Sequence, residues 1–244
     1  MTRPVRLGIL TPSSNTVLEP LSAAIIRGLP GASVHFSRFP VTEIALTPGA
    51  LAQFDDDAVL RAAELLAHAR VDVIAWSGTS ASWLGFGADE ALCGRIQAAT
   101  GVPATTSILA LNDALARTGV RRLGLVTPYR GDVQARIVVN YAALGVECVA
   151  EQHLDLQDNF SFAEVSAPQL DAMVHEVAAA RPDAVAVVCT NLRGAPLVAG
   201  WEAALGVPVY DSVATALWGS LGIAGADASV IQGWGGLFGL LAPA

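Results

Sequence analysis

The sequence is poor in basic residues. Its 244 residues hold 14 Lys+Arg against 22 Asp+Glu, which gives a formal net charge of −8. Proteins that bind nucleic acid or an anionic membrane surface usually present a basic patch, and this composition offers little material for one. We therefore expect neither nucleic acid nor a membrane as a partner.

Cysteine and histidine are too few and too scattered for the usual frameworks. The three cysteines, Cys93, Cys148 and Cys189, fit neither a disulfide framework nor a CxxC metal site, and the four histidines form no HxH or HExxH pattern. No GxGxxG follows the first apolar run, and no Walker motif occurs. We expect reduced thiols, no metal, and no pyridoxal phosphate, nicotinamide or other cofactor.

Long apolar runs are also missing, although 53% of the residues are hydrophobic and only 15% are charged. Asp, Arg or Gly interrupts each run before it reaches the length of a membrane span. The N-terminal segment lacks the apolar core and cleavage site of a signal peptide, so we expect a globular, cytoplasmic protein. The apolar composition favours a buried parallel sheet and a homodimer interface, although Ala-rich coding bias gives the same composition.

The chain contains an internal repeat. RLGILTP at 6–12 returns as RLGLVTP at 122–128, and GVP at 101–103 returns at 206–208. Between these pairs, each half has an apolar run introduced by an aspartate. Three landmarks in the same order and with nearly constant offset predict a duplicated unit.

Each half alternates strands with helices. Apolar runs predict strands at 7–10, 33–39, 71–76, 123–126, 147–153 and 184–188. Helical spacing predicts helices at 17–27, 55–69, 89–100, 132–144, 167–180, near 196–205, and after 214. The glycine-rich segment 233–239 is expected to close the fold as a short strand.

This alternation, together with the repeat, predicts an α/β fold of two similar lobes, each a parallel sheet flanked by helices. The first lobe is expected to span 1–115, with the tail from about 214 to 244 packing back on it. The second is expected to span 116–213. Ligands of such sheets bind outside the carboxyl ends of the strands, which directs attention to four turns between the lobes.

The first turns of the two halves are TPSSNT and TPYRGD. Ser14 or Asn15, and Asp132 in the second half, have the side chains of helix N-caps. Free N–H groups at a helix start also bind carboxylate, so capping and anion binding can share one turn. The side chains of Asn15 and Tyr129 could donate to a substrate oxygen.

The other two turns are SGTSAS and CTNLRG. They supply the remaining candidate site residues: Gly78, Thr79, Ser80, Cys189, Thr190 and Asn191. A lone buried cysteine is more often a small hydrophobe than a nucleophile. However, Cys189 stands at a strand end before a polar turn that opens a helix, a setting that lowers a thiol pKa and favours a reactive residue.

Four motifs together resemble the aspartate/glutamate racemase superfamily, in its branch of maleate cis-trans isomerases and arylmalonate decarboxylases. They are TPSSNTxxEP after the first strand, GTS after the third, TPY in the second half and the cysteine after the last strand of the repeat, and the likeness covers essentially the whole chain. The resemblance implies that the two lobes are related by a pseudo-two-fold axis, with one catalytic residue from each lobe on opposite faces of a substrate carbanion. Racemases and maleate isomerases of this kind use two cysteines.

This sequence departs from the two-cysteine arrangement, because Gly78 stands at the first-half position and only Cys189 remains. Arylmalonate decarboxylases resemble the chain in this respect, whereas the SSNT of the first turn is closer to the isomerase version. The decarboxylase hypothesis makes Cys189 a neutral thiol that protonates an enediolate. Hydroxyls of Thr79, Ser80 and Tyr129, with backbone N–H groups after Gly78 and Cys189, would then hold the carboxylate of a small (di)carboxylate substrate.

Two other hypotheses stay open at this point. A maleate isomerase or racemase would need Ser77 or Ser82 in place of the first thiol, and a non-catalytic carboxylate-binding protein would need no thiol at all. A group of large apolar residues near the third turn could line the pocket, although core packing is the commoner role for such side chains. These residues are Trp76, Trp83, Leu84 and Phe86.

Overall fold

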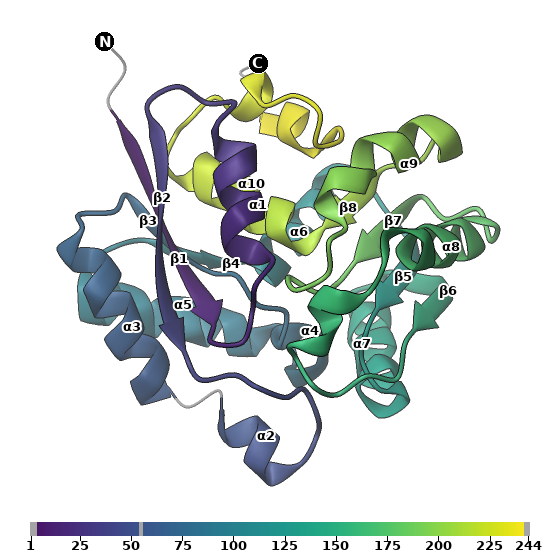
Figure 1. The fold of residues 1–244 in the computed structure, drawn as a ribbon, viewed down its shortest axis with the longest axis horizontal. Helices are drawn as coiled ribbons and strands as arrows, with labels where there is room; N and C mark the ends of the chain where they lie inside the picture. Colours follow the sequence, from purple (N-terminus) through teal and green to yellow (C-terminus); the bar gives the residue numbers. More distant parts are fainter. Residues whose placement is uncertain (1–3, 54–55, 242–244) are drawn as a thin grey trace.

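The computed structural model describes residues 4–53 and 56–241, which form two four-stranded parallel sheets, one in each half of the chain (Figure 1). The first sheet has the order β2-β1-β3-β4, and the second repeats it as β6-β5-β7-β8. The strands of the first sheet are β1 (Val5–Pro12), β2 (Ala32–Phe39), β3 (Val73–Trp76) and β4 (Ala104–Thr106). Those of the second are β5 (Arg122–Thr127), β6 (Glu147–His153), β7 (Ala184–Val187) and β8 (Val209–Asp211). The predicted fold of two similar α/β lobes is confirmed.

Helices flank both sheets. In the first half they are α1 (Leu18–Ile26), α2 (Pro48–Ala52), α3 (Asp56–His68), α4 (Ala81–Leu84), α5 (Gly87–Thr100) and α6 (Ser107–Arg117). In the second half they are α7 (Gly131–Ala143), α8 (Ala167–Ala178), α9 (Val198–Leu205) and α10 (Ser212–Ile223), with short 3₁₀ turns at Ser161–Glu164, Ala195–Leu197, Ala228–Val230 and Leu237–Leu241. Helix α10 lies in the middle of the molecule, where it packs against α6, α1 and the strands β3 and β4 (Figure 1).

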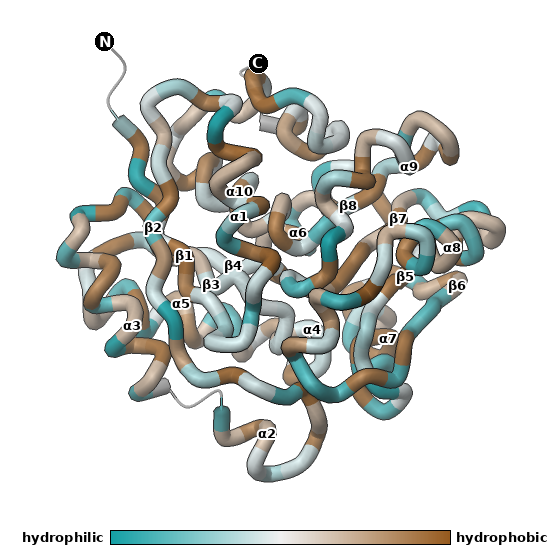
Figure 2. Tube along the Cα trace, in the orientation of Figure 1, coloured by the Kyte–Doolittle hydropathy of each residue, from teal (hydrophilic) through white to brown (hydrophobic). Residues whose placement is uncertain are grey.

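The central strands form the core because their residues are apolar on both faces. β3 and β7 are buried along their whole length, and Figure 2 shows the hydrophobic colouring that runs through the centre of each lobe. Continuous apolar strands of this kind occur where helices cover both faces of a parallel sheet. The sheets therefore hold the ends of their strands rigidly at the meeting point of the two lobes.

The aspartate that introduces an apolar run in each half has a structural role. Asp72 Oδ2 accepts a hydrogen bond from the backbone N–H of Arg6 at 2.8 Å, and Asp183 Oδ2 accepts one from that of Arg122, also at 2.8 Å. Two residues before each aspartate an arginine adopts the left-handed region, with φ of 52° and 51°. Each aspartate thus joins the start of one central strand to the start of its neighbour, which explains why the repeat contains it.

Several details differ from the sequence prediction, which did not include the helices α2, α4 and α6. The edge strands β4 and β8 have three residues each and were not predicted. The segment 233–239 forms no strand and leads into a 3₁₀ turn. Asp132 lies inside the first turn of α7, where its Oδ1 accepts from the next backbone N–H, while Arg130 occupies the N-cap position. Among the described residues, no helix is long and apolar enough to cross a membrane.

Candidate active site

A small cavity lies between the lobes, at the carboxyl ends of the four central strands. Pro12 ends β1, Gly78 follows β3, Tyr129 follows β5 and Cys189 follows β7. The volume of the cavity is about 20 Å³, which leaves room for about one water molecule. Its walls are Pro12, Val41, Ile44, Trp76, Gly78, Thr79, Ser80, Trp83, Tyr129, Asn159, Cys189 and Thr190.

Volume alone would select a different place. A cavity of about 410 Å³ lies beside α9 and the C-terminal segment, and its polar walls are Thr118, Glu202 and Tyr210. These groups are already engaged, since the Tyr210 hydroxyl donates to Thr118 and the Glu202 carboxylate accepts from two backbone N–H groups. The interlobe cavity is the better candidate because it collects a thiol and several hydroxyl groups at strand ends.

A short polar chain crosses the cavity from one lobe to the other. Thr79 Oγ1 and the Tyr129 hydroxyl oxygen lie 2.6 Å apart, and both side chains are buried. The Tyr129 hydroxyl also interacts with the Cys189 thiol, and the backbone N–H of Asn191 donates to the Cys189 sulfur at 3.4 Å. The predicted pairing of Thr79 and Cys189 around one small space is therefore present in the geometry.

The thiol of Cys189 is protonated at neutral pH. Burial raises its pKa from 9.0 to about 12, and the hydrogen bonds from Asn191 and Tyr129 oppose this only in part. The expectation of a lowered pKa is wrong because burial of the thiol outweighs these hydrogen bonds, and the helix that follows, α9, begins only at Val198. Cys189 is thus equipped to give a proton, and poorly equipped to attack as a thiolate.

The other two cysteines lie away from the site. Burial also raises the pKa of Cys93 to about 12 and that of Cys148 to about 11, so the pKa values do not separate the three thiols. Position does, because only Cys189 lines the interlobe cavity.

Gly78 is the first-lobe counterpart of Cys189. Trp76 pairs with Leu10 as Val187 pairs with Val126, and two residues further along stand Gly78 and Cys189. The indole of Trp76 occupies the space beside Gly78, since a Cβ at position 78 would lie 2.0 Å from Cζ2 of the ring. A side chain at position 78 therefore requires the indole to move.

The two serines considered as substitutes for the first thiol do not line the cavity. Ser82 Oγ donates to the carbonyl oxygen of Thr79 at 2.7 Å, and the buried Ser77 Oγ has no hydrogen-bond partner within the described residues. Of the apolar candidates, Trp76 and Trp83 line the cavity, whereas Leu84 lines a neighbouring one and Phe86 stacks against a buried tyrosine.

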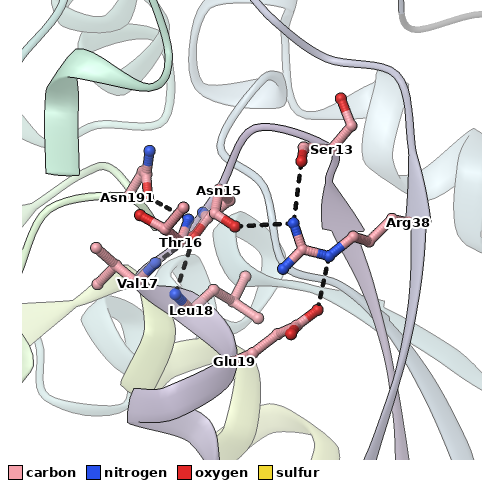
Figure 3. A network of polar contacts seen from close by, with 8 residues as sticks. All are labelled: Ser13, Asn15, Thr16, Val17, Leu18, Glu19, Arg38 and Asn191. Atoms are coloured by element: carbon pink, nitrogen blue, oxygen red, sulfur yellow. Dashed lines mark hydrogen bonds and ion pairs between the residues drawn. The ribbon is translucent and has the colours of Figure 1, made fainter.

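Asn15 joins the lobes instead of facing the cavity. Its Oδ1 accepts from the backbone N–H groups of Val17 and Leu18, at 3.0 and 2.9 Å, which caps the start of α1 (Figure 3). Its Nδ2 donates to Thr190 Oγ1 at 3.1 Å, and Thr190 Oγ1 donates in turn to the carbonyl oxygen of Ser77. Asn15 thereby holds Thr190, which does line the cavity.

Asn191 and Ser14 belong to the same seam. Asn191 Oδ1 accepts from the backbone N–H of Thr16 at 3.1 Å (Figure 3), and its Nδ2 donates to the carbonyl oxygen of Asn159 at 2.6 Å. Asn159 Nδ2 donates to Ser14 Oγ, which donates to the carbonyl oxygen of Val41. Neither Asn191 nor Ser14 lines the cavity, so both act through neighbours.

Asn159 is the polar wall residue that the sequence reasoning missed. It comes from the loop after β6, and its backbone N–H donates to the carbonyl oxygen of Thr42, while the N–H of Ile44 donates to that of Gln157. These bonds tie the loop after β2 to the loop after β6 across the cavity. Asparagine in a long loop is a common turn residue, so nothing in the sequence marked it.

Comparison with known proteins shows which family the chain belongs to. A family model described as arylmalonate decarboxylase matches residues 34–238. The chain belongs to this family. An arylmalonate decarboxylase of Bordetella bronchiseptica is 30% identical over 169 residues, which covers 68% of this chain and 70% of that protein. A maleate isomerase of Geobacillus stearothermophilus is 24% identical over 229 residues, covering 89% and 91%.

The fold of the family is equally clear. The structure of a maleate isomerase from Pseudomonas putida S16 with maleate superposes with a TM-score of 0.88 at 24% identity, covering 97% of this chain and 98% of that one. The resemblance stated from the four turns is confirmed. This member of the arylmalonate decarboxylase family is an enzyme whose relatives include decarboxylases and cis-trans isomerases.

Proposed function

We propose that the protein is a cofactor-independent decarboxylase of small malonate-like dicarboxylates, with Cys189 as the proton donor. One observation carries the proposal: a single protonated thiol lines the cavity, and the indole of Trp76 fills the space beside Gly78 where a second thiol would stand. A donor on one face of a planar intermediate suits decarboxylation followed by protonation. It does not suit racemisation, which needs an acid and a base on opposite faces.

The carboxylate that stays on the substrate would be held by neutral donors. The backbone N–H groups of Thr79, Ser80 and Thr190 have no hydrogen-bond partner among the described residues, and the Thr79 and Tyr129 hydroxyls lie beside them. Such fixed donors stabilise the negative charge that develops on an enediolate. Among the described residues that line the cavity there is no arginine or histidine. The site would therefore hold the anion with neutral donors and no positive charge.

The carboxylate that leaves would lie against the apolar walls. The side chains of Pro12, Val41 and Ile44, which line the cavity, have no hydrogen-bonding group to offer it. A buried, poorly solvated carboxylate is unstable, and loss of neutral CO₂ relieves this cost. The bond between the two carbons breaks, its electron pair remains as the enediolate, and the Cys189 proton moves to the carbon. The thiolate then takes a proton from solvent.

A maleate-type isomerase is the second candidate, because curated relatives carry that name and because the first turn reads SSNT. The resemblance to maleate isomerases implies that this reaction begins with attack by the thiol of the first lobe. Gly78 stands at that position here, and the raised pKa of Cys189 keeps the remaining sulfur protonated. The geometry therefore favours decarboxylation.

One experiment separates the candidates. The protein is incubated in deuterated water with methylmalonate, phenylmalonate, maleate and aspartate, each in parallel with Cys189→Ser and with Cys93→Ser as a matched control. A monocarboxylate product with one deuterium on the carbon that carried the lost CO₂, absent only in Cys189→Ser, is expected. Fumarate from maleate would establish the isomerase instead, and binding of carboxylates without any product would establish a binding protein.

Several properties predicted from the sequence belong to the same proposal. The enzyme is expected to be cytoplasmic, to act on a small carboxylate without metal or organic cofactor, and to form a homodimer. Loss of activity on treatment with EDTA would contradict the expectation that the enzyme needs no metal. Sedimentation of the purified protein as a monomer would contradict the last.

A further inference from the structure

Trp76 borders two cavities. On one side its indole lines the Cys189 cavity, and on the other it lines a cavity of about 80 Å³ between β2, α3 and α5. Ser80 is the only other residue among the described walls that the two cavities share, and its hydroxyl accepts a hydrogen bond from Trp76 Nε1 at 3.4 Å. The indole and this small side chain together form the partition between the two spaces.

The second cavity, here called the Phe39 cavity, is mainly apolar. Its walls are Phe39, Val59, Trp76, Ser80, Leu84, Ala88, Asp89, Leu92 and Arg95. The ring centroids of Phe39 and Trp76 lie 4.8 Å apart, so Phe39 packs directly against the indole. Asp89 Oδ2 accepts a hydrogen bond from the Thr106 hydroxyl, and Arg95 is the other charged residue in the wall.

The Cys189 cavity is bounded on one side by the indole of Trp76. Its volume of about 20 Å³ is a quarter of that of its neighbour, and the indole is nearly fully buried, at 2% exposure. An aryl group on the substrate carbon has no space beside Gly78 while the ring of Trp76 stands there. Without the indole, the two cavities would form one chamber that runs from the thiol to Phe39.

We propose that Trp76 is the specificity-determining residue of the site, and that it restricts the enzyme to malonates with small alkyl substituents by separating the Phe39 cavity from Cys189. This inference rests on the proposed function, since it names the substrate class of that site. Removing the indole opens the Phe39 cavity to the substrate and shifts the preference towards aryl-substituted malonates. Hydrophobic pockets discriminate by size in this way, by about 10- to 200-fold per group that fits or fails to fit.

Binding in a variant that does not turn over tests the inference separately from the chemistry. Cys189→Ser and Cys189→Ser/Trp76→Leu are titrated with methylmalonate and with phenylmalonate by calorimetry. The ratio of the two dissociation constants is expected to move at least about tenfold in favour of phenylmalonate when Trp76 is replaced. Phe39→Leu in the same background is the matched control, because it enlarges the Phe39 cavity but leaves the partition in place, and its ratio should stay near that of the parent.

The outcomes divide cleanly. An unchanged ratio in Trp76→Leu, or an equal shift in Phe39→Leu, would overturn the role of Trp76. If Trp76→Leu fails to unfold cooperatively, Trp76→Phe replaces it, with a smaller shift in the same direction expected and no shift counting against the inference. If the ratio shifts but the folded protein with Cys189 intact releases no CO₂ from either malonate, the role of Trp76 would be supported and the proposed decarboxylase function would be wrong.

Discussion

The two lobes share one topology but carry opposite side chains at corresponding strand ends. In the first lobe β3 ends with a large residue, Trp76, and a glycine follows at position 78. In the second lobe β7 ends with Val187, and Cys189 follows at the equivalent place. The indole of Trp76 thus fills the space that a side chain at position 78 would occupy. The two lobes therefore differ at Gly78 and Cys189, the pair of positions where identical lobes would carry two thiols.

This asymmetry divides the work between the lobes. The second lobe supplies the proton donor, the Tyr129 hydroxyl and the backbone N–H of Thr190. The first lobe supplies the Thr79 hydroxyl, the backbone N–H groups of Thr79 and Ser80, and most of the apolar wall. Substitutions at matched positions in the two lobes should therefore have unequal effects. The following comparisons test how far the inequality goes.

The largest expected effect is on turnover. Cys189→Ser should lower kcat for the decarboxylated malonate by about 10²- to 10⁴-fold, because the hydroxyl is a far weaker acid than the thiol at this position. Cys93→Ser is the control, since Cys93 is partly buried but lies outside the cavity. The measurement is CO₂ release under saturating substrate, together with circular dichroism to show that both variants are folded. Equal rates in the two variants would place the proton donor elsewhere.

A buried carboxyl in each lobe should make stability depend on pH in an unusual direction. Burial raises the pKa of Asp211, which caps α10, from 3.8 to about 7, and raises that of Asp89 to about 7 against an opposing hydrogen bond from Thr106. The unfolded chain loses these protons near pH 4, while the folded chain keeps them until about pH 7. The contribution to the free energy of unfolding is therefore present below pH 4 and is lost as the pH rises towards 7, by up to about 4 kcal/mol for each group.

Asparagine at position 211 keeps the oxygen that caps α10 but has no proton to lose. Urea unfolding of Asp211→Asn should therefore show a smaller fall in stability between pH 4.5 and pH 7.5 than the parent protein shows. Asp183→Asn serves as the reference without a slope, because backbone N–H groups of Arg121 and Arg122 hold the pKa of exposed Asp183 below its usual value, so this carboxyl stays ionised throughout the window. If Asp211→Asn and the parent change in parallel with pH, the Asp211 carboxyl is ionised in the folded protein at all these pH values.

Some features of the fold and of the site could be predicted from the sequence, and others could not. The central strands, the two lobes and the four turns follow from apolar runs and their repetition, which are local properties of the chain. The strands β4 and β8 escaped because ATT and VYD are too short to show a period. The direction of the Cys189 pKa shift was wrong because burial, which dominates it, depends on the packing of the whole cavity.

The candidate site was predictable only in part. Residues at strand ends, such as Thr79 and Tyr129, line the cavity as expected, because the topology alone brings them there. Asn15 and Asn191 have the right residue type and lie close by, yet their side chains are used between the lobes. The placement of the Trp76 indole over Gly78 depends on a side-chain rotamer, which no pattern in the sequence encodes.

Gly78→Ala measures how firmly the indole holds its place. A methyl group at position 78 overlaps the ring, so the variant should be destabilised by about 1–3 kcal/mol, as overpacked cores are. Gly94→Ala is the matched control: it lies within α5 with open space around its Cα, and replacing a helical glycine there should stabilise by about 0.5–1 kcal/mol. The measurement is chemical denaturation at constant pH.

The destabilisation by Gly78→Ala should depend on whether Trp76 is present, which the double variant with Trp76→Leu tests. In the double variant the extra methyl group has space, so the penalty for Gly78→Ala measured in the Trp76→Leu background should fall by at least about half. An unchanged penalty would mean that the backbone at Gly78, and not the indole, rejects a side chain. The glycine would then be a feature of the turn and would say nothing about the missing thiol.

The smallest effect concerns the first turn of each lobe, where Asn15 and Asp132 occupy similar positions before α1 and inside α7. Asn15→Ala removes the acceptor for two backbone N–H groups and the donor to Thr190, all of them buried, so it should cost about 1–2 kcal/mol of stability. Asp132→Ala removes one bond to the next residue and an exposed contact with Arg130 at 3.8 Å, and should change stability by less than about 0.5 kcal/mol. Because Asn15 also positions Thr190 at the cavity wall, its loss should raise KM for the malonate while Asp132→Ala leaves KM unchanged. Equal effects of the two substitutions on both quantities would show that the seam at Asn15 has no special connection to the site.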